Sequence, residues 1–157
     1  MRRLTWVLLF VAIVFVPTPA HADLPWVRPV PGPVVEGFHP PLSRYGAGHL
    51  GVHFKVPPGT PVRAAGGGVV TFAGDVAGDL NVVILHRDGL RTTYAFLATL
   101  AVHDGDQVIR GQVIGVTGGR GPGHDGDVLH FGLRRGDTYL DPLSLFDPAD
   151  VHLAPLH

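Results

Sequence analysis

Hydrophobic residues from position 48 onward come in short runs that glycine interrupts, and no run keeps a helical period for more than about two turns. Alternating and β-branched residues fill these runs, which is typical of strands. The predicted strands are residues 60–64, 69–73, 81–85, 90–96, 107–109, 112–117 and 128–134. Arg87-Asp88-Gly89 joins two of them as a hairpin. We therefore predict an all-β single domain whose strands close into a compact β-sandwich or barrel.

The first 22 residues follow a different pattern, that of a secretory signal peptide. Arg2 and Arg3 precede an apolar run over 4–16, which is too short to cross a bilayer comfortably. Ala20-His21-Ala22 is a small-x-small sequence that a signal peptidase accepts. We expect export, cleavage after Ala22 and no stable membrane span afterwards. The alternative is an uncleaved membrane anchor.

The residues after position 22 are numerous enough for one domain with its own core. Residues 23–41 contain six prolines, so we expect them to be an extended, mostly irregular lead-in. The domain itself is expected over residues 42–146. Residues 147–157 are expected to form a C-terminal tail.

The composition excludes several classes of protein. The chain has a single lysine, Lys55, and the signal holds two of the 12 basic and none of the 13 acidic residues, so the remainder has a formal charge of −3. Such a domain has no basic face for nucleic acid or anionic lipid. Because the chain has no cysteine, disulfides and lipid attachment through cysteine are excluded. A V-x-x-G-x-x-V frame at 56–62 and 102–108 also occurs in lipoyl carrier domains, but their modified lysine needs a hairpin tip and Lys55 lies inside a run.

The ten histidines raise the question of a metal site. Five are expected in the signal, the flanking segments or a surface turn: His21, His39, His103, His152 and His157. His49 and His53 differ because they bracket Gly51. In a straight strand their side chains would share a face but stand about 13 Å apart. A bend at Gly51 would bring both imidazoles within reach of one ion.

Longer motifs surround this pair. His49-x-Gly51-x-His53 is followed by P-x-T-P-V-x-A-A-x-G-x-V over 58–69. Further matching segments follow in order: Asn81-x-Val83-x-Leu85-His86, Thr92-Thr93-Tyr94, G-D-x-V-x-x-G-Q-x-I-G over 105–115, and Leu129-His130-Phe131-Gly132-Leu133. Over about residues 35–146 the chain resembles the lysostaphin/LytM-type zinc metallopeptidases, which cut peptidoglycan cross-bridges.

The resemblance implies zinc as a cofactor and names its ligands. In that family the metal is held by the histidine and aspartate of H-x-G-x-D and by the second histidine of a closing H-x-H. The matching positions here are His49, His53 and His130, so a histidine replaces the aspartate. Three neutral imidazoles are still a sound zinc site. The site would carry one more unit of positive charge than that of the family.

The two further histidines that the family places near the metal are both replaced. Phe96 stands where Y-x-H has its histidine, and Val128 stands at the first position of H-x-H. Neither side chain can move a proton or donate a hydrogen bond. Candidate substitutes are His124, otherwise a solvated loop residue, and Tyr94, otherwise a packed one. His86 is interpreted as a packed, hydrogen-bonded structural residue.

Three functions remain open at this point. The first is an exported, cell wall-associated, degenerate domain that binds peptidoglycan or its stem and cross-bridge peptides, or regulates a murein hydrolase as its partner. The second is an active zinc-dependent peptidoglycan endopeptidase with a three-histidine metal site and a substitute base. The third is a metal-free envelope binding module.

Overall fold

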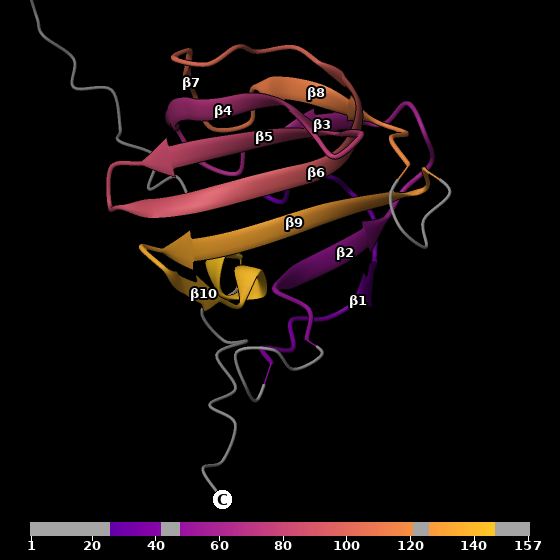
Figure 1. The fold of residues 1–157 in the computed structure, drawn as a ribbon, viewed down its shortest axis with the longest axis horizontal. Helices are drawn as coiled ribbons and strands as arrows, with labels where there is room; N and C mark the ends of the chain where they lie inside the picture. Colours follow the sequence, from indigo (N-terminus) through magenta and orange to yellow (C-terminus); the bar gives the residue numbers. More distant parts are fainter. Residues whose placement is uncertain (1–25, 42–47, 121–125, 147–157) are drawn as a thin grey trace, which may run out of the picture.

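The computed structural model describes residues 26–41, 48–120 and 126–146, and these form an all-β domain, as predicted (Figure 1). The expected signal peptide and C-terminal tail lie outside the described residues. The strands are β1 (Val34–Glu36), β2 (Gly51–Lys55), β3 (Pro61–Arg63), β4 (Gly68–Val76), β5 (Asp79–His86), β6 (Leu90–Leu100), β7 (Gln107–Val108), β8 (Val113–Thr117), β9 (Val128–Arg135) and β10 (Thr138–Leu140). A short 3-10 helix, η1 (Pro142–Leu145), follows them. No helix in the described ranges is long and apolar enough to cross a membrane.

All ten strands belong to one antiparallel sheet with the order β1-β2-β9-β6-β5-β4-β7. Figure 1 shows β4, β5, β6, β9 and β2 stacked from the top of the view to the bottom. β10 pairs with β9, while β8 pairs with both β3 and β6. The order places β2 beside β9, although these strands lie far apart in the sequence. This pairing joins the two ends of the domain.

A bulge in β6 divides that strand into two parts. Tyr94 lies opposite Val82 of β5, but Leu97 lies opposite Leu80, so the register shifts between them. Phe96 sits in this shift with a φ of 66°, in the left-handed region that few non-glycine residues adopt. Before the bulge β6 pairs with β9, and from Leu97 onward it pairs with β8. Bulges of this kind bend a strand and redirect a side chain.

The core consists of apolar side chains from nearly every strand. Phe54, Tyr94 and Phe131 are completely buried, and their rings pack with centroids 5.3 Å apart for Tyr94 and Phe131 and 6.3 Å apart for Phe54 and Phe131. The proline-rich lead-in contributes Val30, which is only 3% exposed, and Trp26, which packs against the core. Within the described part of the lead-in, residues 26–41, the only strand is residues 34–36, which form β1 and pair with β2.

His86 anchors a buried chain of hydrogen bonds, which confirms its predicted structural role. Its Nδ1 lies 2.9 Å from the carbonyl of Gly67 and its Nε2 lies 2.8 Å from the hydroxyl of Thr92. That hydroxyl lies 3.0 Å from the hydroxyl of Tyr94, which accepts a hydrogen bond from the amide of Ala65. A carbonyl can only accept, so Nδ1 carries the proton and Nε2 of the neutral ring accepts from Thr92.

The two titratable side chains in this hydrogen-bond chain, His86 and Tyr94, both favour their neutral forms. Burial lowers the pKa of His86 below its usual 6.5, although the Gly67 carbonyl and the charge of Asp88 oppose the shift. Burial also raises the pKa of Tyr94 to about 12. Protonation of His86 would make Nε2 a donor to Thr92, and one of the two hydroxyl protons of Thr92 and Tyr94 would then have no acceptor in this chain of hydrogen bonds. The folded state therefore resists protonation at this histidine.

This resistance makes stability depend on pH. Below pH 6.5 the unfolded chain binds a proton at His86 that the folded chain still excludes, so we expect the free energy of unfolding to fall as the pH drops from 7.5 towards 5. Urea unfolding in the presence of a chelator would measure this slope. His86→Gln should flatten it, whereas His103→Gln, a change in a side chain that is 92% exposed, should not. Equal slopes in all three proteins would contradict the prediction.

Candidate metal centre

Three imidazoles from the two ends of the domain meet around one point. His49 Nε2 lies 3.1 Å from His53 Nε2 and 3.3 Å from His130 Nδ1, and the last two atoms lie 3.0 Å apart. His53 is 5% exposed, and the other two are partly buried. These are the three residues predicted as metal ligands, and the structure brings all three together.

The pairing of β2 with β9 produces this arrangement. His53 and His130 are directly opposite each other in the two strands, on the same face of the sheet. His49 precedes β2 and is held by a backbone bridge to His39, with hydrogen bonds in both directions at 2.7 and 2.9 Å. The backbone bends at Leu50, between His49 and the start of β2 at Gly51. The His49 and His53 rings therefore approach to 4.2 Å between centroids.

Gly51 has a different role from the one expected. It was predicted to allow a bend through its conformational freedom, but it starts β2 and has no positive φ. A Cβ atom at this position would lie 2.6 Å from the Phe131 carbonyl oxygen and 2.7 Å from Cε1 of His130. Glycine is therefore required because the His130 ring lies against the backbone of β2.

The lead-in orients two of the three rings through their Nδ1 atoms. The Gly37 carbonyl lies 2.8 Å from His49 Nδ1, and a carboxylate oxygen of Glu36 lies 2.7 Å from His53 Nδ1. Both partners accept, so both Nδ1 atoms carry protons in the neutral rings and both Nε2 atoms present lone pairs. Two such lone pairs facing each other at 3.1 Å repel unless a cation lies between them.

The three nitrogens also have the spacing that a tetrahedral zinc ion requires. A Zn–N distance of 2.0–2.1 Å places two tetrahedral ligand nitrogens about 3.3 Å apart. The observed separations of 3.0, 3.1 and 3.3 Å are close to this value. The donor set and its second-layer acceptors therefore fit zinc.

Phe96 and Val128 border this cluster. The Phe96 ring centroid lies 6.0 Å from that of His53 and 6.1 Å from that of His130. The bulge in β6 points the side chain at the cluster, because Ala95 just before it is paired with His130. Val128, two residues before His130 on the same strand, is 6% exposed. Apolar atoms thus stand at the two positions where the resemblance leads one to expect imidazoles.

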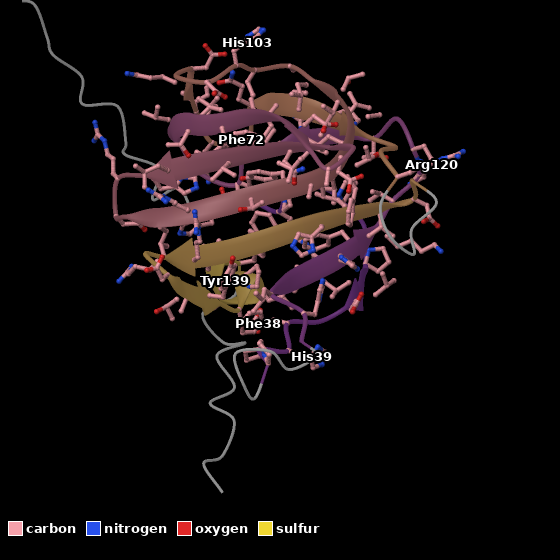
Figure 2. The ribbon with its side chains drawn as sticks, in the orientation of Figure 1. Phe38, His39, Phe72, His103, Arg120 and Tyr139 are labelled. Atoms are coloured by element: carbon pink, nitrogen blue, oxygen red, sulfur yellow. The ribbon has the colours of Figure 1, made fainter. Side chains whose placement is uncertain are left out.

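The two candidate substitutes have different outcomes. Tyr94 is completely buried and its hydroxyl belongs to the interior chain with Thr92 and Ala65, so the packed alternative holds for it. His124 lies outside the described residues. His39 and His103 lie at opposite edges of the molecule in Figure 2, and His103 is exposed as expected.

Sequence reasoning missed Glu36. The single available signal is that Glu36 is the only glutamate in the chain, which does not by itself place it beside a histidine. Its position depends on β1, which no periodic pattern predicts.

The sheet brings together His53 from β2, His130 from β9 and His49 from the segment just before β2. This arrangement in an all-β sheet defines a lysostaphin-type peptidase domain. The chain belongs to Peptidase family M23, whose model matches residues 47–142. This segment includes all three histidines of the cluster, Phe96 and Val128.

Individual similarities agree with the family. The chain is 38% identical to the uncharacterized protein Rv2891 of Mycobacterium tuberculosis, over 88% of this chain and 58% of that protein. It is 37% identical to the DD-carboxypeptidase/endopeptidase Mpg of Neisseria meningitidis, over 71% of this chain and 25% of that protein. The catalytic domain of lysostaphin from Staphylococcus simulans superimposes with a TM-score of 0.63 at 31% identity, over 71% of this chain and 90% of that one. The chain thus spans little more than half the length of the first of these relatives and a quarter of the second.

The close approach at Gly51 generates a prediction. Gly51→Ala should lower the free energy of unfolding by about 1–3 kcal/mol, because the new methyl group overlaps the Phe131 carbonyl and the His130 ring. Gly67→Ala is the matched control, since its Cβ would meet no atom closer than 3.5 Å. Urea midpoints of the two variants test the difference, and a Gly51→Ala protein as stable as the Gly67→Ala protein would contradict it.

Proposed function

We propose that this chain is an exported cell-envelope domain that binds zinc and peptidoglycan peptides but hydrolyses them poorly or not at all. The observation that carries the proposal is the combination of a converged three-histidine cluster with apolar side chains at both neighbouring catalytic positions. Binding to stem or cross-bridge peptides, or regulation of a murein hydrolase, is the role that fits such a domain.

Zinc would be held by His49, His53 and His130. Their three nitrogens converge, and a bound zinc ion would supply a Lewis acid and a water of lowered pKa. Gly37 and Glu36 fix the tautomers that leave both Nε2 atoms free of protons. Three protein ligands leave a fourth position open, as a site for water or a peptide carbonyl requires.

Hydrolysis also needs a group that moves a proton and a donor for the oxyanion. Losing a general acid–base contact costs about 10²–10⁴-fold in rate, and losing an oxyanion donor costs about 10²–10³-fold. Phe96 and Val128 supply neither function. Glu36 does not replace them, because its carboxylate contacts His53 at Nδ1, on the opposite side of the ring from the cluster.

The second candidate is an active zinc endopeptidase, and the intact three-ligand cluster favours it. It requires a proton-transfer group from elsewhere, for which His124 is the candidate. The two functions predict the same metal content and differ in turnover.

Purified protein without its signal should bind about one zinc ion per chain, measured by elemental analysis after dialysis. With zinc and purified peptidoglycan it should release no new amino termini above a blank, measured by reaction with an amine reagent. Turnover that a chelator and His49→Ala both abolish would establish the active enzyme. Absence of zinc uptake would favour the metal-free binding module.

Restoring the two family histidines should restore some turnover. Phe96→His combined with Val128→His returns a proton-transfer group and a hydrogen-bond donor to the cluster, so amino termini should be released at least about 10²-fold faster than by the parent. Histidine is one of the non-glycine residues that tolerate the left-handed backbone found at position 96. Phe96→Leu combined with Val128→Ile is the matched control and should stay inactive. If the histidine pair gains nothing while still binding zinc, these two positions do not explain the low activity.

A further inference from the structure

We propose that Glu36 is a positioning residue for the metal centre. Its carboxylate contacts His53 from outside the ligand set and supplies the negative charge that an aspartate ligand at position 53 would provide. The inference rests on the proposed zinc site and deepens it. It concerns a residue in the lead-in, outside the segment matched by the family model.

The contact itself is short and specific. One Glu36 carboxylate oxygen lies 2.7 Å from His53 Nδ1, and the other lies 3.9 Å from His49 Nδ1. His53 is nearly buried, with a side chain 7% exposed, whereas the Glu36 side chain is 48% exposed. The carboxylate can therefore stay hydrated on one side while it holds a buried ring on the other.

A bulge in β1 places Glu36 there. Val34 lies opposite Phe54, so an unbroken antiparallel register would put Val35 opposite His53 and Glu36 opposite Val52. The register instead shifts, Glu36 lies opposite His53, and Val35 is left 54% exposed. A bulge that leaves a valine in solvent to bring a carboxylate to a histidine is the kind of local irregularity that accompanies functional sites.

The chemistry explains why a carboxylate is useful at this point. Three neutral imidazoles give a zinc site one more positive charge than two imidazoles and an aspartate. A carboxylate that accepts a hydrogen bond from the Nδ1–H of a ligating histidine fixes the orientation of the ring and increases the basicity of its other nitrogen. Glu36 thus compensates for the histidine at position 53 without becoming a ligand itself.

Zinc affinity, measured by competition with a chromophoric chelator, tests the inference without relying on activity. Glu36→Ala should weaken zinc binding by about 10–100-fold. The glutamine in Glu36→Gln can still accept a hydrogen bond from His53 Nδ1 but carries no charge. The zinc affinity of this variant should therefore fall between those of the parent and Glu36→Ala. The control is Asp106→Asn, which removes the carboxylate near exposed His103 and should leave zinc affinity within about twofold of the parent. Cobalt substitution supplies a second readout, since the visible absorption bands report the geometry around the metal.

A double-mutant cycle then separates a role at the metal from a general surface role. In a His53→Asp background the negative charge is back among the ligands, so Glu36→Ala should cost less than about twofold in zinc affinity. A Glu36→Ala protein that binds zinc as tightly as the parent, or loses the same factor in both backgrounds, would overturn the inference. If the parent itself takes up no zinc, the proposed metal function fails instead. Urea midpoints of all variants show whether each is folded.

Discussion

The pairing of β2 with β9 is the interaction on which the rest of the structure depends. It closes the domain by joining an early strand to a late one, and it sets His53 directly opposite His130. The same register requires glycine at position 51, because the His130 ring lies against the β2 backbone there. β2 is covered on both faces as a result: Val52 and Phe54 face the core, and His53 faces the histidine cluster. A slip of one residue between these strands would exchange the two faces and destroy both the core and the site.

The second layer of the site comes from a part of the chain that contributes little else to the sheet. β1 has three residues, two of them exposed, yet its last residue, Glu36, is the acceptor for His53, and Gly37 just after it is the acceptor for His49. The lead-in is secured upstream by Val30 in the core and by Trp26 against His86, and backbone bonds such as that from Val27 to Ala65 help to hold it. Orientation of the rings therefore depends on packing on another side of the domain.

Much of this could be read from the sequence, for physical reasons that also explain the failures. β5 was visible as a short run of consecutive apolar residues, Val82 to Leu85. β9 was visible because Leu129, Phe131 and Leu133 alternate with His130 and Gly132. The ligand positions were accessible because His49, Gly51 and His53 stand inside several matching motifs. β1 was not accessible, since three residues between prolines and glycine have no period to detect. The contact of Glu36 depends in addition on a bulge, which no pattern of residue types specifies.

Phe96 shows which part of the site has been kept and which has changed. A residue with a φ of 66° in the middle of a strand costs free energy, and a bulky aromatic residue is poorly suited to it. The bulge nevertheless remains, with Gly119 donating a hydrogen bond of 3.0 Å to the Phe96 carbonyl. Because β6 must leave β9 and join β8 at this point, the backbone geometry belongs to the fold as much as to the chemistry. A fold that needs the bulge can hold phenylalanine at this position and still keep the three histidine nitrogens together, so the geometry of the cluster does not depend on an imidazole at position 96.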